Sequence, residues 1–238
     1  MPTLALTPPG YDLQSLAVGR ASHFTEYVTA DEFSTVASDG GACAVADGAN
    51  GILAITASDG TVADNDETYL KGTNEVFLFA ANRSIYFQAL VQYAEANTDD
   101  ANVIIGFKDA VAANTLLDNG AGPPASYSGA CFFKVDGGTV WQVESSLGGT
   151  QTTTTTNITA GGSAYHLFEI EFHAINATQG EISFKYDGQV VCDSNNRPIK
   201  HQITFTSATE MQECIGVKNG GANLETVSVD AMACWQTR

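Results

Sequence analysis

Hydrophobic and polar side chains alternate along three stretches of the chain. A period of two is typical of a strand that buries one face and exposes the other. We therefore predict three long strands whose hydrophobic positions point into a core. They span residues 85–93, with Ile85, Phe87, Ala89, Val91 and Tyr93 inward; residues 167–173, with Phe168, Ile170 and Phe172 inward; and residues 226–236, with Val227, Val229, Ala231, Ala233 and Trp235 inward.

Pairs of Asp or Asn followed by Gly separate the hydrophobic segments. Such pairs suit the positive φ angles of tight hairpin turns. Residues 132–143 and 184–191 read as hairpins closed by Asp136-Gly137 and Asp187-Gly188. Other pairs are Asp39-Gly40, Asp47-Gly48, Asn50-Gly51, Asp59-Gly60, Asn119-Gly120 and Asn219-Gly220.

Strands and turns at this spacing indicate an all-β protein, a two-sheet antiparallel sandwich of about a dozen strands. The threonine run 152–156 fits a strand, and only residues 109–118 could form a short helix. With no linker in the chain, we expect one domain over residues 21–238. Residues 1–20 hold three of the six prolines and read as an extended N-terminal arm. Its hydrophobic side chains are expected to lie against the chain's own sandwich or to bind a partner: Leu4, Leu6, Tyr11, Leu13 and Leu16.

The composition of the chain limits the classes of partner that we expect it to bind. The net charge of −17 repels phosphate backbones, so we expect no nucleic acid to bind. No hydrophobic run reaches the roughly 18 residues that span a bilayer, and the N-terminus lacks the features of a signal peptide, so we expect no membrane and assembly in a cytosol. Five scattered cysteines without a CxxC pair predict buried free thiols. They are Cys43, Cys131, Cys192, Cys214 and Cys234.

Candidate catalytic groups are few. The sequence contains neither HExxH nor GxSxG, and we expect its four histidines, His23, His166, His173 and His201, to be structural. Glu169 and Glu171 share a strand face, as paired glycosidase carboxylates do, but we expect that face to be solvated. The acidic turns 64–67 and 99–100 offer oxygens to calcium, yet hydration is the simpler interpretation. We therefore predict no enzyme, with no catalytic residue, metal or cofactor.

Three segments carry a resemblance to a known family. Residues 85–91, then 102–109, and the hairpin 181–191 are similar in order and pattern to strands of the concanavalin-like, laminin-G-like jelly rolls. The resemblance covers roughly residues 21–238. It implies two antiparallel sheets packed face to face, and it reports on fold more than on function.

Within this family the chain resembles jelly-roll structural proteins of tailed bacteriophages, on residues 92–103, 122–130, 134–141 and 197–201. The resemblance implies a virion component: a capsid decoration (cement) protein on the capsid exterior, assembled in the bacterial host cytoplasm. Its expected partners are the major capsid protein and further copies of itself, for which a trimer suits threefold positions of a shell. The alternative is a lectin-like carbohydrate-binding module. Its candidate sugar-stacking aromatics are Tyr127, Trp141, Tyr165 and Trp235.

Overall fold

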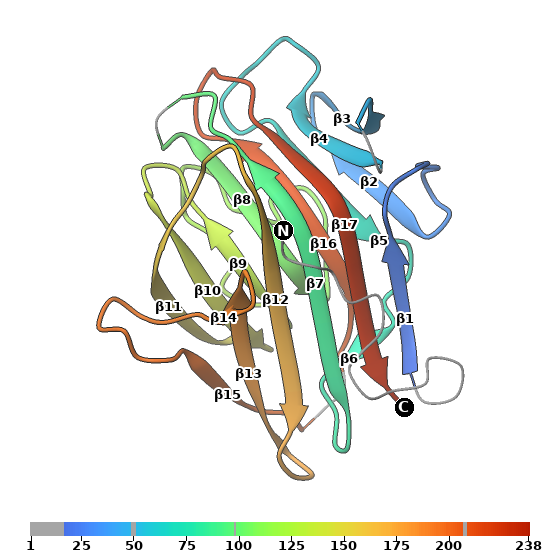
Figure 1. Cartoon of the computed structure of the whole chain (residues 1–238), viewed down its shortest axis with the longest axis vertical. Helices are drawn as coiled ribbons and strands as arrows, with labels where there is room; N and C mark the ends of the chain where they lie inside the picture. The colour runs from blue at the N-terminus through green and yellow to red at the C-terminus, as the bar shows by residue number, and fades with distance from the viewer. Residues whose placement is uncertain (1–16, 49–50, 98, 207–208) are drawn as a thin grey trace.

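The computed structural model describes residues 17–48, 51–97, 99–206 and 209–238. Within them the protein is a sandwich of two antiparallel sheets and has no helix, which confirms the predicted fold class. Figure 1 shows sheet A in front of sheet B. Sheet A has nine strands: β1 (Ala17–Ser22), β3 (Gly40–Ala46), β4 (Ile52–Ser58), β7 (Ser84–Tyr93), β12 (Tyr165–Ala174), β13 (Gln179–Tyr186), β14 (Gln189–Val190), β15 (Lys200–Thr204) and β17 (Thr226–Thr237). Sheet B has eight: β2 (Phe33–Ala37), β5 (Glu67–Gly72), β6 (Phe77–Leu78), β8 (Ala101–Lys108), β9 (Gly129–Lys134), β10 (Val140–Leu147), β11 (Thr150–Thr159) and β16 (Glu210–Asn219).

The order of strands in each sheet is not the order in the chain. Sheet A runs β14-β13-β12-β7-β17-β4-β3, with β1 beside β17 and β15 beside β13. Sheet B runs β11-β10-β9-β8-β16-β5-β2, with β6 beside β16. Strands β8–β11 in sheet B and β12–β14 in sheet A are consecutive hairpins, whereas the centre of each sheet pairs strands far apart in the chain: β7 with β17, and β8 and β5 with β16.

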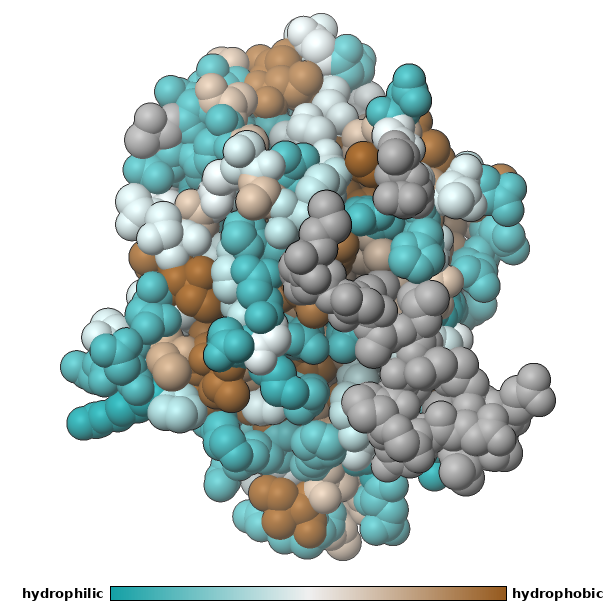
Figure 2. All heavy atoms as spheres, in the orientation of Figure 1, coloured by the Kyte–Doolittle hydropathy of each residue, from teal (hydrophilic) through white to brown (hydrophobic). Residues whose placement is uncertain are grey.

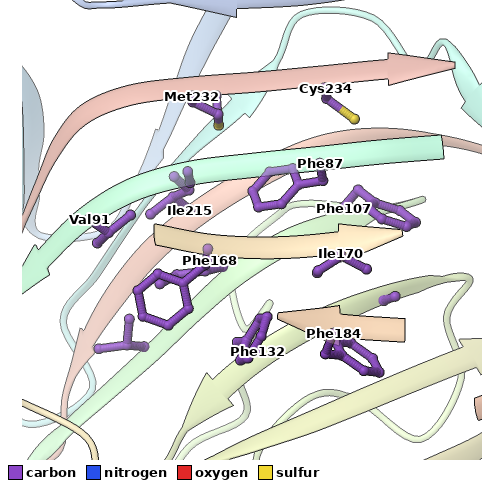
Figure 3. Packing of buried hydrophobic residues seen from close by; sticks show 14 of the residues in the cluster. Phe87, Val91, Phe107, Phe132, Phe168, Ile170, Phe184, Ile215, Met232 and Cys234 are labelled. Carbon is purple, nitrogen blue, oxygen red and sulfur yellow. The ribbon is translucent and has the colours of Figure 1, made fainter. Parts of the chain in front are cut away.

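The core lies between the inner faces of the sheets. Phe132 of β9 contacts Phe168 of β12 and Phe184 of β13, with ring centroids 5.2 and 5.5 Å apart. Figure 3 shows these rings pointing toward one another from opposite sheets. The contacts are edge-to-face, the arrangement that aromatic quadrupoles favour. Outside, most of the surface in Figure 2 is hydrophilic, with hydrophobic groups scattered over it.

The predicted alternation of inward and outward residues holds along the whole of two strands, and in the third strand it reverses part of the way along. Along β7 and β12 the predicted residues point into the core. In β17 the register shifts between Val229 and Ala231, as an extra residue in one strand of a pair does. After this shift Met232 and Cys234 enter the core, whereas Trp235 lies against Gly19 of β1 on the outer face. The inward placement predicted for Ala231, Ala233 and Trp235 is therefore wrong.

The structure also tests the predicted turns and the predicted buried free thiols. Asp187 and Gly188 close the hairpin of β13 and β14 with φ angles of 52° and 75°, and Gly137 follows β9 with a φ of 72°. All five cysteines are free; three are buried, while Cys43 and Cys192 are half-buried. The prediction of free thiols is confirmed, and that of burial holds for three.

Residues 109–118, the one segment that could have formed a short helix, do not form one. These residues belong to a loop, residues 109–128, that lies over the outer face of sheet B. Val111 and Leu116 of the loop bury their side chains against the outward residues Tyr69 and Ile104. No helix of the described residues is long and hydrophobic enough to cross a membrane.

The N-terminal segment enters sheet A at Ala17. Residues 17–20, the end of the predicted arm, pair with β17. Arg20 points between the sheets, where its guanidinium donates to both carboxylate oxygens of Glu213 at 2.9 and 3.1 Å. Burial nevertheless raises the pKa of Glu213, because its desolvation outweighs the attraction of Arg20. The proposed partner-binding residues Leu4, Leu6, Tyr11, Leu13 and Leu16 lie outside the described residues.

Candidate functional site

A hollow lies on the outer face of sheet B, between strands β9–β11 and the loop 109–128. Its volume is about 380 Å³. The strands supply a mostly polar floor, and the loop supplies a mostly hydrophobic wall. The lining residues are Leu117, Gly120, Ala121, Pro123, Ala125, Phe133, Val135, Gln142, Glu144, Gln151 and Thr153.

A buried lysine fixes the loop that forms the wall. Lys218 of β16 points outward and donates to the side-chain oxygens of Asn114 and Asp118 at 2.7 and 2.5 Å. Its ammonium also contacts Glu67 of β5 at 3.2 Å, and Glu67 accepts the backbone N–H of Asn114 at 2.7 Å. A buried ammonium needs such partners, because unpaired it would cost several kcal/mol. The loop, which carries Leu117, is therefore held against the sheet.

Glu144 of β10 occupies the floor and is almost fully buried. Its Oε1 accepts the hydroxyl of Tyr127 at 2.8 Å and the amide Nε2–H of Gln151 at 3.1 Å, and its Oε2 accepts the hydroxyl of Thr153. Burial raises the pKa of Glu144, although these donors oppose the shift. Burial also holds the pKa of Tyr127 well above its usual range, so Tyr127 keeps its proton and donates.

The remaining groups on the floor differ in polarity. The side chain of Gln142 makes no hydrogen bond to any residue that the structure describes, so both ends of its amide are available. Phe133 of β9 belongs to the small hydrophobic cluster on this face of sheet B and lines the hollow beside Gln142. The hollow therefore pairs free polar groups with a hydrophobic ring, as sites for partly polar small molecules do.

The glutamates singled out in the sequence lie on the other sheet. Glu169 and Glu171 of β12 point outward from sheet A. Glu171 contacts Lys185 at 2.6 Å and His173 at 3.8 Å, and hydrogen bonding to His173 and Lys185 lowers its pKa to about 2. Glu169 accepts the amide of Gln88 at 3.1 Å, and burial raises its pKa. The outward orientation was predicted correctly, but Glu169 is buried rather than solvated.

The other candidates do not form a site. Trp141 and Tyr127 are buried, and Tyr165 and Trp235 are half-buried away from the hollow. In the acidic turn 64–67, Asp66 accepts the backbone N–H of Ala63 at 2.8 Å and Glu67 binds Lys218. Within the described ranges no group of three or more His, Cys, Asp and Glu is arranged to hold a metal ion.

Comparison with known proteins places this geometry in a structural class. No family model matches the chain, and no curated protein sequence matches it. Among solved structures, the carbohydrate recognition domain of Emp47p is similar with a TM-score of 0.59 at 12% identity, covering 94% of this chain and 98% of that one. Peanut lectin is similar with a TM-score of 0.57 at 9% identity, covering 93% and 97%. The endo-1,3-beta-glucanase of Streptomyces sioyaensis gives a TM-score of 0.58 at 14% identity, covering 98% and 99%.

These likenesses define the fold as a concanavalin-like jelly roll of the kind found in lectins and glucanases. They correct one prediction. The absence of familiar catalytic motifs led us to predict no enzyme, and this is contradicted, because the same fold carries an endo-1,3-beta-glucanase. Fold and active site vary independently, so a missing motif is a poor guide in this fold. The phage origin, the capsid location and the major capsid protein as partner stay predictions.

Proposed function

We propose that this chain binds a neutral saccharide in the hollow over sheet B. One observation carries the proposal: the free amide of Gln142 and the carboxylate of Glu144 lie beside the ring of Phe133 in a volume of about 380 Å³. Sites for small molecules typically measure about 300–1,000 Å³ and combine a hydrophobic lining with a few placed polar groups. The carbohydrate recognition domain and the lectin of similar fold support this class of ligand.

The hydrogen-bonding capacity of the floor suits hydroxyl groups. A carboxylate offers roughly four acceptor positions, and Glu144 uses three for Tyr127, Gln151 and Thr153. One position is left for a ligand hydroxyl, and the Gln142 amide adds a donor and an acceptor. A uronate would bring a second carboxylate close to Glu144 in a chain of net charge −17, which favours an uncharged sugar.

The test is a glycan array containing neutral and uronate oligosaccharides, followed by titration calorimetry on the glycans that bind. Gln142→Ala should weaken binding about tenfold, because it removes one or two hydrogen bonds to the sugar. Ala125→Trp should abolish binding by filling the hollow from an exposed position of the loop. The same glycans should be assayed for new reducing or unsaturated ends, because the fold also carries enzymes.

Two matched variants serve as controls. Gln202→Ala changes an exposed glutamine on β15 of the other sheet, and Ala113→Trp places the same bulky ring on an exposed part of the same loop, outside the hollow. Both should bind as the unmodified chain does. An array without any bound glycan, or a glycan that binds Ala125→Trp undiminished, would refute the proposal. The predicted decoration role is tested separately, by mass spectrometry of purified virions.

A further inference from the structure

Strand β11 forms an open side of the molecule. It is the last strand of sheet B and, with ten residues, is longer than the terminal strands β2, β3 and β14 of five, seven and two residues. Figure 1 shows it at the left-hand side, opposite β2 and β3. Its inner neighbour β10 pairs with one side of its backbone over residues 150–155 and, after a register shift, at residue 159.

The other side of the β11 backbone is free over its first half. Asn157 donates its N–H to the carbonyl of Cys192 at 3.0 Å, away from β10. Backbone groups of alternate residues point to the same side of a strand. Gln151 and Thr153 therefore direct their N–H and C=O groups outward, where no backbone group of the described residues pairs with them, whereas beyond them the bridge between Thr156 and Asp193 covers the edge.

Strand β11 lacks the residue types that prevent the edge of one sheet from pairing with the edge of another. The strand reads TQTTTTTNIT and contains no charge and no proline, whereas natural edges are commonly protected by lysine or proline. Threonine has high β-propensity. The whole chain carries a net charge of −17, so two copies repel each other least where an uncharged surface meets its own equivalent.

We propose that β11 pairs with β11 of a second copy of this chain, antiparallel and through residues 150–154. A two-fold axis perpendicular to the sheet relates the two strands and joins two copies of sheet B into one continuous sheet. Such an interface is closed and self-complementary. Because this operation keeps the outer faces on one side, the two hollows, each lined by Gln151 and Thr153, lie next to each other. The pairing does not depend on what the hollows bind.

Hydrogen exchange of the full chain at increasing concentration tests the pairing directly. The amides of residues 151 and 153 should exchange rapidly in dilute protein and become at least about tenfold slower in concentrated protein. The amides of residues 152 and 154, which face β10, should be protected at both concentrations and provide an internal control. Light scattering should show a mass rising to twice the 25.0 kDa of one chain.

Thr153→Pro removes one outward N–H from an exposed position of the strand. Proline is tolerated where an edge N–H faces solvent, so the monomer should fold, and the dimer should dissociate at least about ten times more readily. Thr153→Ser keeps the N–H and the hydroxyl and should dimerise normally. A monomer at all concentrations, a trimer, or exchange at residues 151 and 153 that is independent of concentration would overturn the proposal. The exchange result on the unmodified chain decides the question even if Thr153→Pro does not fold.

Discussion

His201 of β15 is buried between the sheets and makes the folded state sensitive to acid. Its Nδ1 lies 3.0 Å from the hydroxyl of Ser145, and its Nε2 lies 3.0 Å from the hydroxyl of Thr154. Its ring packs against Phe184, with centroids 5.3 Å apart. A neutral imidazole satisfies both hydroxyls by donating to one and accepting from the other. Burial lowers the pKa of His201 from 6.5 to about 4, because the charged ring would lose its hydration.

This shift gives a definite sign and size to the effect of pH. Above pH 6.5 neither the folded nor the unfolded chain protonates the ring, so His201 has no pH-dependent effect. As the pH falls below 6.5, the unfolded chain binds a proton that the folded chain excludes, and folding weakens. A difference of about 2.5 pKa units corresponds to about 3 kcal/mol, which is fully lost near pH 4.

Urea unfolding of the unmodified chain and of His201→Gln should measure this loss. The fluorescence of the buried Trp141 reports unfolding, and glutamine keeps one donor and one acceptor without titrating. At pH 7 the variant should be less stable, because its amide does not reproduce the ring packing. Toward pH 4 the difference between the proteins should shift by about 3 kcal/mol in favour of the variant. Other titrating groups contribute equally to both proteins and cancel. A difference that stays constant from pH 7 to pH 4 would show that His201 is not held neutral.

Three substitutions test the contacts that hold the sheets and the loop 109–128; urea unfolding measures the first and the third, and proteolysis measures the second. Arg20→Met leaves Glu213 buried without its cation and should lower the free energy of unfolding by about 3–5 kcal/mol. The additional change Glu213→Met should restore most of this loss. A double variant in which the effects of the two changes simply add would argue against this pairing. Lys218→Met should release the loop 109–128, so that chymotrypsin cleaves this loop faster than in the unmodified chain while cleavage elsewhere is unchanged. A loop that resists cleavage equally in both proteins would contradict the anchoring role of Lys218. Gly216→Ala should cost several kcal/mol, because a Cβ there would lie 2.0 Å from the ring of Tyr69; a stable variant would show that this ring can move.

The local pattern of the sequence was sufficient to predict the strands that bury one face. In β7 and β12 the alternation of hydrophobic residues is direct, and the structure confirms it. The error in β17 has a local cause: the extra residue between Val229 and Ala231 reverses the faces, and an alternating run of small and hydrophobic residues gives no sign of it. At residues 109–118 the failure is tertiary. The loop is held by Lys218, which follows Asp118 by 100 residues.

The hollow could not be predicted from the sequence. Its polar floor joins Gln142 and Glu144 of β10 to Gln151 and Thr153 of β11, and only the register of these strands shows that their side chains share a face. Glu144 also carried no motif, since its donors come from a loop and from the next strand. Glu169 and Glu171 attracted attention because they are neighbours on one strand, whereas the structure separates them from the hollow by the thickness of the sandwich.

Side-chain hydrogen bonds add to the backbone ladder with β10 in holding β11 at the edge of sheet B. On its inner face Thr154 bonds His201, and Thr156 donates to the carbonyl of Trp141 at 2.7 Å. On its outer face Thr153 and Gln151 bond Glu144. Both faces of the strand are thus used within one chain, and among the described residues the backbone edge is left unpaired over residues 150–154. An uncharged strand anchored in this way can accept a further strand without disturbing either its inner contacts or the hollow, which is why self-association and ligand binding can be measured as separate properties of the same sheet.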